Sequence, residues 1–172
     1  MRIVLALGGN ALLRPDDDGT VESELRRARQ SLQPIKELLS GREKILITHG
    51  NGPQVGNALL RVELSIPKTP ARPLDHLVSD TQGGLGYLLE RTIRNIIRET
   101  ESSREVMAML AQVEVDSNEE SFADAIKPIG PYYPTENKMD LERKGWIVKN
   151  TERGLRRLVP SPRPKRIVEL EI

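Results

Sequence analysis

Residues 44–56, KILITHGNGPQVG, lead from an apolar β-rich run through a glycine-rich turn into a helix-forming segment. Residues 2–10, RIVLALGGN, show the same order of apolar run and glycine turn. Each stretch predicts a strand that ends in a small loop, because glycine and asparagine accept the backbone angles of tight turns. In an open parallel α/β sheet, the carboxyl ends of neighbouring strands line one crevice. We therefore expect the two loops to lie side by side.

The two loops predict a phosphate site. Glycines there let backbone N–H groups approach an anion without a Cβ in the way, and the start of a helix favours negative charge. One such turn often does no more than close a tight connection, so the prediction rests on the presence of two. The candidate binding residues are Gly8, Gly9 and Asn10 in the first loop and His49, Gly50, Asn51 and Gly52 in the second.

The alternation of predicted elements indicates the α/β class. A helical pattern over 21–39 is interrupted by Pro34, a strand over 44–48 follows, and Pro53 suits the first turn of the next helix. Such alternation predicts a crossover between parallel neighbouring strands. Further on, the pattern predicts a helix over 74–97 and a strand over 106–115. The helix predicted over 74–97 is interrupted by Gly83, Gly84 and Gly86. These glycines predict either fraying of the first half of the helix or a close approach of its backbone to another element or subunit.

Composition limits the function classes. The 172 residues suit one domain with a small lobe, and the absence of cysteine excludes a disulfide framework, a thiolate metal site and a cysteine nucleophile. We expect a cytoplasmic protein, because a chain without cysteine suits a reducing compartment and because no signal peptide or membrane span is evident. The net charge of +1 gives no general attraction to nucleic acid or to a membrane, so we expect neither as a partner.

The character of the sequence changes after residue 115. Residues 114–124 hold five acidic residues, and residues 153–166 hold six basic ones. We interpret 1–115 as an α/β lobe, 116–164 as a protruding lid-like subdomain with a short helix over 136–144 and a short strand over 146–149, and 165–172 as a return strand toward the main lobe.

Few side chains in this sequence are candidates for catalysis or metal binding. No Ser/His/Asp order, paired histidines at metal spacing or Walker lysine is present, so we expect no metal bound by protein side chains. A lone histidine such as His49 is more often a hydrogen-bonded structural group than a base, although its place at a strand end keeps a functional role open. Lys127, in a Pro/Gly-rich segment, is the candidate catalytic cation.

Six strings in order and spacing resemble carbamate kinases, members of the amino acid kinase family. They are residues 6–12, 48–56, 73–75, 81–87, 127–133 and 156–162. The resemblance spans nearly the whole chain. It implies a three-layer α/β/α sandwich with a mostly parallel sheet, a protruding subdomain and a homodimer.

The resemblance also implies a reaction, the reversible phosphoryl transfer between carbamoyl phosphate and ADP that gives ATP and carbamate. Gly8, Gly9 and Asn10 would cradle the phosphoryl group, Asn51 and Gly52 would hold the carbamate carboxylate, and Lys127 would reach the site from the lobe. ATP or ADP with Mg²⁺ would be the co-substrate.

The chain also departs from the family pattern. Carbamate kinases continue for about as much chain again, and that part is expected to supply the nucleotide pocket, which is largely missing here. We therefore expect a truncated or incomplete form that a second chain could complete. Two alternatives stay open: another amino acid kinase with a different carboxylate substrate, and a non-catalytic binding module that uses residues 153–166. Those basic residues could instead be a solvated edge that balances the acidic stretch.

Overall fold

The computed structural model describes residues 1–8, 11–14, 17–118 and 120–168. Its strands are β1 Arg2–Leu7, β2 Lys44–His49, β3 Val113–Val115, β4 Ala125–Tyr133, β5 Ile147–Thr151, β6 Gly154–Pro160 and β7 Pro164–Ile167. Its α-helices are α1 Val21–Leu32, α2 Lys36–Ser40, α3 Gly52–Ser65, α4 Leu74–Arg98 and α5 Lys138–Arg143. Short 3₁₀ turns are η2 Gln33–Ile35, η3 Glu120–Phe122 and η4 Thr135–Asn137. The predicted α/β class is confirmed.

The chain divides into two compact units. The parallel unit comprises Met1–Pro53 and Val78–Leu110, and the antiparallel unit comprises Gln54–Leu77 and Ala111–Ile172. The boundaries expected after residues 115 and 164, and the three-layer arrangement, stay predictions.

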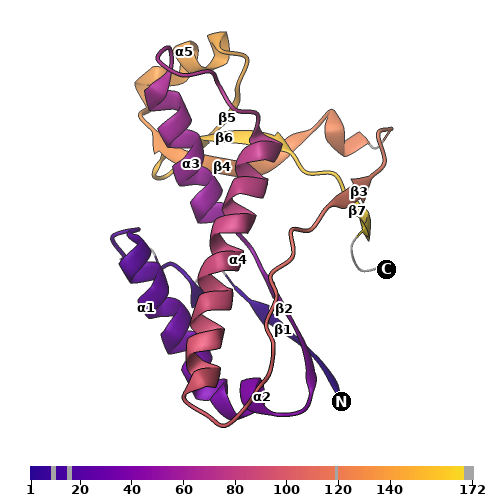
Figure 1. Cartoon of the computed structure of the whole chain (residues 1–172). Helices are drawn as coiled ribbons and strands as arrows, with labels where there is room; N and C mark the ends of the chain where they lie inside the picture. Colours follow the sequence, from indigo (N-terminus) through magenta and orange to yellow (C-terminus); the bar gives the residue numbers. More distant parts are fainter. Residues whose placement is uncertain (9–10, 15–16, 119, 169–172) are drawn as a thin grey trace. The chain divides into compact units, whose positions relative to one another are not determined.

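Strands β1 and β2 of the parallel unit lie side by side and run in the same direction (Figure 1). Their register pairs Arg2 with Lys44 and Leu7 with His49, so the predicted parallel neighbours are confirmed. Because side chains alternate along a strand, one face of this pair presents Leu7, Ile45 and Ile47 to the core. The opposite face carries Val4 and Leu46, which are 67% and 39% exposed.

The core of the parallel unit is aliphatic and comes mainly from α1, α2 and α4. Helical spacing of apolar residues places one stripe of α4 inward. The buried cluster consists of Leu12, Ala28, Leu32, Leu39, Leu85, Leu88, Leu89, Ile93, Ile96 and Ile97.

The interruption predicted at Pro34 is also confirmed, since η2 separates α1 from α2. Proline has no N–H to donate and its ring blocks the preceding turn.

The predicted strand over 106–115 is wrong for most of its length. Only Val113–Val115 is a strand, and it pairs antiparallel with β7. The residues before it follow α4 instead: a Cβ built on Gly86 would lie 3.1 Å from the Ala108 Cβ, and Arg94 donates a hydrogen bond to the Val106 carbonyl at 2.5 Å. Among the described residues, side-chain contacts with a helix replace the backbone ladder that a strand requires. Gly86 therefore serves a close approach, and α4 continues through all three glycines.

The antiparallel unit is built on the three-stranded sheet β4–β6–β5. Residues 54–65 of α3 run beside β4, where a Cβ on Gly56 would lie 3.5 Å from the Gly130 Cα. The Tyr133 hydroxyl donates to the Glu63 carboxylate at 2.9 Å and joins the same two elements. The helix predicted over 136–144 forms as η4 and α5, and the strand predicted from Trp146 begins at Ile147.

Candidate functional site

The two glycine loops follow neighbouring strand ends, as predicted. Leu7 and His49 are register partners, so Gly8 and Gly50 each stand one residue beyond the ends of adjacent parallel strands. Strands so paired lie about 4.8 Å apart. The Gly8 carbonyl accepts a hydrogen bond from the Ala11 N–H at 2.9 Å, which turns the chain back at this point. Gly9 and Asn10, which were predicted to belong to this loop's site, lie outside the described residues.

Three glycines of the loops have open space where a side chain would stand. A Cβ built on Gly8, Gly50 or Gly52 meets no described atom within 4 Å. None of the three has a positive φ. Neither the backbone angle nor packing against the described chain therefore requires glycine here. A residue without a Cβ would also let a ligand approach the backbone N–H groups closely.

Asn51 anchors its loop to helix α4. Its side-chain Nδ2 donates to the Val78 carbonyl at 3.1 Å and to the Thr81 hydroxyl oxygen at 2.9 Å. The Thr81 hydroxyl in turn donates to the same Val78 carbonyl at 2.9 Å. Both amide hydrogens of Asn51 are thus used within the fold. The side chain fixes the loop, while the loop's backbone N–H groups remain the donors that an anion could meet.

The anchoring role of Thr81 was not predicted from the sequence. The pattern placed Thr81 only within the helix predicted over 74–97. A contact between residues thirty positions apart has no local signal. The one available hint was that residues 81–87 form one of the strings shared with carbamate kinases.

Helix α3 begins at Gly52, directly after this loop, and runs for 14 residues. The first N–H groups of a helix have no partner within it, and the helix dipole places partial positive charge there. Pro53 in the first turn carries no N–H, so the donors are those of the residues around it. His49 is the last residue of β2, before this loop, and its Nδ1 is 3.3 Å from the Gly50 carbonyl oxygen. That contact is local and does not assign the imidazole a chemical role.

Lys127 is an exposed residue of β4 in the antiparallel unit. Its register partner on β6 is Val159, and Ile129 pairs with Arg157. Lys127 and Arg157 therefore project from the same face of the sheet. Within the part of the chain that the structure describes, Lys127 forms no ion pair.

The basic segment of residues 153–166 is engaged inside the antiparallel unit. Lys165 pairs with Asp116 at 2.9 Å and Arg166 with Glu114 at 2.5 Å, so its end contacts the acidic stretch. The pairing with Lys165, followed by a hydrogen bond from Asn118, lowers the pKa of Asp116.

Arginines at the start of the segment lie over aromatic rings. The Arg153 and Arg156 guanidinium carbons are 4.6 and 4.7 Å from the centre of the Tyr132 ring. The guanidinium carbon of Arg157 lies 4.3 Å from the centre of the Trp146 ring.

Burial, followed by the hydrogen bond to Glu63, raises the pKa of the neighbouring Tyr133.

The described residues contain no group of three or more His, Cys, Asp or Glu side chains arranged to hold a metal ion. No helix among them is long and apolar enough to cross a membrane.

Comparison with known proteins identifies close relatives. No family model matches the sequence. Carbamate kinases of Pyrococcus horikoshii and Oenococcus oeni are 39% and 38% identical, each over 99% of this chain and 55% of the relative. The chain thus spans about half the length of the curated relatives it matches.

Solved structures agree with the sequence comparison. An Aeropyrum pernix K1 protein superposes with a TM-score of 0.92 at 37% identity, over 99% of this chain and 55% of the other. Carbamate kinase from Giardia lamblia bound to AMP-PNP gives a TM-score of 0.86 at 30% identity, with the same coverage. These likenesses establish the amino acid kinase fold for the chain.

Proposed function

We infer that this chain, a homologue of the N-terminal portion of carbamate kinases, provides the acyl-phosphate half of a phosphotransferase site. The reaction is reversible phosphoryl transfer between carbamoyl phosphate and ADP, which gives ATP and carbamate. The observation that carries the proposal is the pair of open glycine loops at register-matched strand ends, one of them fixed by Asn51.

The chemistry suits such a site. Phosphoryl transfer needs alignment of the attacking and leaving oxygens and neutralisation of the charge spread over the moving group. Backbone N–H groups fixed in advance stabilise that charge without reorganising during the reaction. The loop at Gly8 with Gly9 and Asn10 would bind the phosphoryl group. The loop at Asn51 and Gly52, at the start of α3, would bind the carboxylate.

Nucleotide binding is assigned to a second segment. Mg²⁺ would enter with the nucleotide, because this metal is usually held by substrate phosphates with one or two carboxylates and not by a protein cage. The curated relatives are nearly twice as long as this chain. The exposed apolar face of β1 and β2 at Val4 and Leu46 is where a segment corresponding to the rest of those relatives would pack. We also propose, from the resemblance alone, that the completed protein is a homodimer.

Complementation tests this function. The chain is co-expressed with the remaining segment of a carbamate kinase, and ATP formation from carbamoyl phosphate and ADP is measured. We expect ATP from the purified mixture and none from either piece alone. A stable complex that binds ADP but forms no ATP would contradict the proposal.

Lys127 is proposed as the cation that neutralises the phosphoryl group. In the reconstituted enzyme, Lys127→Ala should lower turnover by about a hundredfold or more, the usual effect of removing a group that stabilises transition-state charge. Lys149→Ala is the matched control, because it removes an equal charge from the same sheet. Equal turnover in both variants would remove Lys127 from the catalytic assignment.

The alternatives make different predictions. Another amino acid kinase would phosphorylate a larger carboxylate in preference to carbamate, which a substrate panel would reveal. A binding module would need its basic residues available, yet Lys165 and Arg166 are paired with acids and three arginines lie on rings. These contacts favour the interpretation that the segment balances the acidic stretch.

A further inference from the structure

The loop that Asn51 anchors contains two residues that can react with each other. Asn51 is followed by Gly52, and it is the one asparagine of the chain that precedes a glycine. Glycine has no Cβ to shield its backbone nitrogen, so this nitrogen can reach the side-chain amide carbon, Cγ, of the asparagine before it. Such a cyclisation leads to deamidation. The proposed phosphotransferase function assigns no modification to this position.

The attacking group of this pair is accessible. Gly52 is exposed, and a Cβ built on it meets no described atom within 4 Å. Gly52 is also the first residue of α3, so its N–H has no acceptor within the helix. The described chain therefore leaves room around the Gly52 nitrogen, and water can approach it.

The leaving group of the pair is restrained. Asn51 Nδ2 donates to the Val78 carbonyl at 3.1 Å and to the Thr81 hydroxyl oxygen at 2.9 Å, both in α4. A primary amide has two N–H donors, so both are engaged. Because Nδ2 leaves as ammonia in deamidation, the reaction must break both hydrogen bonds. The fold thus slows a reaction that the local sequence permits.

We propose that Asn51 is a deamidation site whose rate is limited by its contact with Thr81. The Gly52 nitrogen loses its proton and forms a bond to Asn51 Cγ. The bond from Cγ to Nδ2 breaks, and Nδ2 takes up a proton and leaves as ammonia. Water then opens the cyclic imide, which gives aspartate or isoaspartate at position 51.

The product would release the loop from α4. A carboxylate at position 51 has no N–H to donate to the Val78 carbonyl, and its negative charge would face that oxygen. The added charge would also oppose the binding of an anion. This last consequence rests on the proposed function, whereas the modification itself does not.

Mass spectrometry of the whole chain tests the role of Thr81. The folded protein is incubated at mildly alkaline pH, which speeds loss of the Gly52 proton, and digested; the mass gain from amide to carboxylate is followed in the peptide that contains position 51. Thr81→Val should gain mass about fivefold faster than the original chain, the factor that corresponds to one ordinary hydrogen bond. Thr81→Ser keeps the hydroxyl and should react at the original rate.

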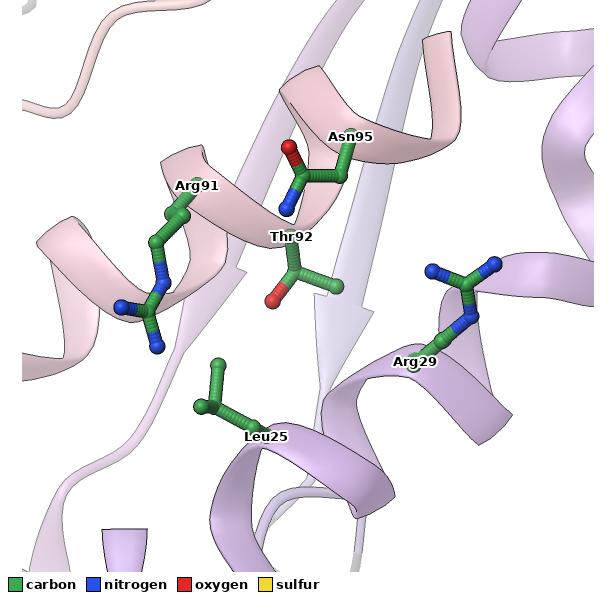
Figure 2. Close-up of a pocket in the computed structure, with 5 residues that line it drawn as sticks. All are labelled: Leu25, Arg29, Arg91, Thr92 and Asn95. Carbon is green, nitrogen blue, oxygen red and sulfur yellow. The ribbon is translucent and has the colours of Figure 1, made fainter. Parts of the chain in front are cut away.

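A second threonine of α4 is the matched control. Thr92 lies further along this helix, where it lines the groove between α1 and α4 shown in Figure 2. Its hydroxyl donates to the Leu88 carbonyl at 2.8 Å, as the Thr81 hydroxyl donates to the Val78 carbonyl at 2.9 Å. Thr92→Val removes an equivalent hydroxyl without touching Asn51, so it should leave the rate at position 51 unchanged.

Gly52→Ala tests the attacking nitrogen. The added methyl group has room in the described chain, and it hinders the approach of the nitrogen to Cγ. Combined with Thr81→Val, this substitution should bring the rate below that of the original chain.

Three results would overturn the proposal. They are equal rates in Thr81→Val and Thr81→Ser, an unchanged rate after Gly52→Ala, and a mass gain at the exposed Asn150 as fast as at position 51. Should Thr81→Val not fold, the original chain is compared in buffer and in urea, where equal rates would show that the folded contacts do not restrain the reaction. The readout is a mass and not an activity, so a failure of the complementation experiment would leave it unaffected and the two proposals fail separately.

Discussion

The parallel and antiparallel units are held together by different interactions. The parallel unit buries one continuous aliphatic cluster of ten residues. The antiparallel unit has fewer buried apolar side chains, chiefly Leu141 and Leu155 on its sheet side, and surrounds Tyr132 and Trp146 with arginines. A fully buried aliphatic side chain contributes about 1.5–3 kcal/mol, whereas an exposed ring–cation contact contributes about 0.5–1 kcal/mol. Stability should therefore depend on packing in the first unit and on backbone geometry and polar contacts in the second.

The largest effect should come from the core of the parallel unit. Ile96 is completely buried in the aliphatic cluster. Ile96→Ala should lower the free energy of unfolding by about 2–5 kcal/mol, because it removes apolar contacts and leaves a cavity. Urea denaturation followed by far-UV circular dichroism measures the change. Arg98→Ala, on the exposed side of the same helix, should change it by less than about 0.5 kcal/mol. A small effect of Ile96→Ala would show that the cluster is not the main source of stability.

The next effect tests backbone geometry in the antiparallel unit. Gly154 begins β6 with φ +120°, and a Cβ there would lie 2.6 Å from the Tyr133 carbonyl oxygen. Gly154→Ala should cost at least about 1–3 kcal/mol, the range for backbone strain, with the clash added. Fluorescence of Trp146, the single tryptophan, reports on this unit.

Gly145→Ala is the matched control for Gly154. Its φ is +77°, but a Cβ there meets nothing within 4 Å. The difference between the two variants therefore reports the contact with the Tyr133 carbonyl together with the greater backbone strain of alanine at φ +120°. Equal unfolding midpoints would contradict the close approach of β6 to β4 at this position.

A smaller effect is expected from the polar contact between α3 and β4. Tyr133→Phe removes the hydroxyl that donates to Glu63 and should cost about 1.5 kcal/mol, the lower end of the range for hydrogen bonds to charged groups, because the contact is only partly buried. Tyr87→Phe, at a 65% exposed ring, should be nearly neutral. Unfolding of both variants is followed by tryptophan fluorescence. Matching curves would show that the hydroxyl is not needed to hold α3 against the sheet.

Local patterns predicted most of the fold. The runs at 2–7 and 44–48 are largely apolar and are followed by glycine-containing turns, and a proline in a helix interior, such as Pro34, interrupts the helix. These features need no tertiary information. The segment at 106–112 could not be predicted in the same way. An apolar run indicates burial, but whether it becomes a strand depends on a hydrogen-bonded neighbour. Among the described residues, Val106 and Ala108 contact α4, and Gln112 accepts a hydrogen bond from Val168.

The candidate site also has features that the sequence predicts and features that it does not. Glycines at the strand ends are visible in the sequence because their residue type itself carries the signal. The attachment of Asn51 to Val78 and Thr81 is not visible, because it joins a loop to a helix far along the chain. The engagement of Arg166 with Glu114 is likewise long-range, and charge counts alone left the role of that segment open.

The smallest effect concerns a polar contact in the unit that depends chiefly on packing. Asp18 accepts hydrogen bonds from the Thr20 N–H at 3.0 Å and the Thr20 hydroxyl at 2.8 Å, just before α1. The backbone N–H of Thr20, followed by the Ser23 and Thr20 hydroxyls, lowers the pKa of Asp18 from 3.8 to about 2. Because the folded-state pKa is the lower one, the ionised carboxylate stabilises the fold fully above about pH 4, and this contribution is lost as the pH falls toward 2. Asp18→Asn should therefore reduce stability at pH 7 and flatten its decline between pH 4 and pH 2, measured by urea denaturation at each pH. Asp124→Asn removes an equal charge from an exposed position in the antiparallel unit. If both variants retained the pH dependence of the original chain, the hydrogen bonds of Asp18 would contribute nothing to the stability of the start of α1, and the contrast between the two units would be sharper than those bonds indicate.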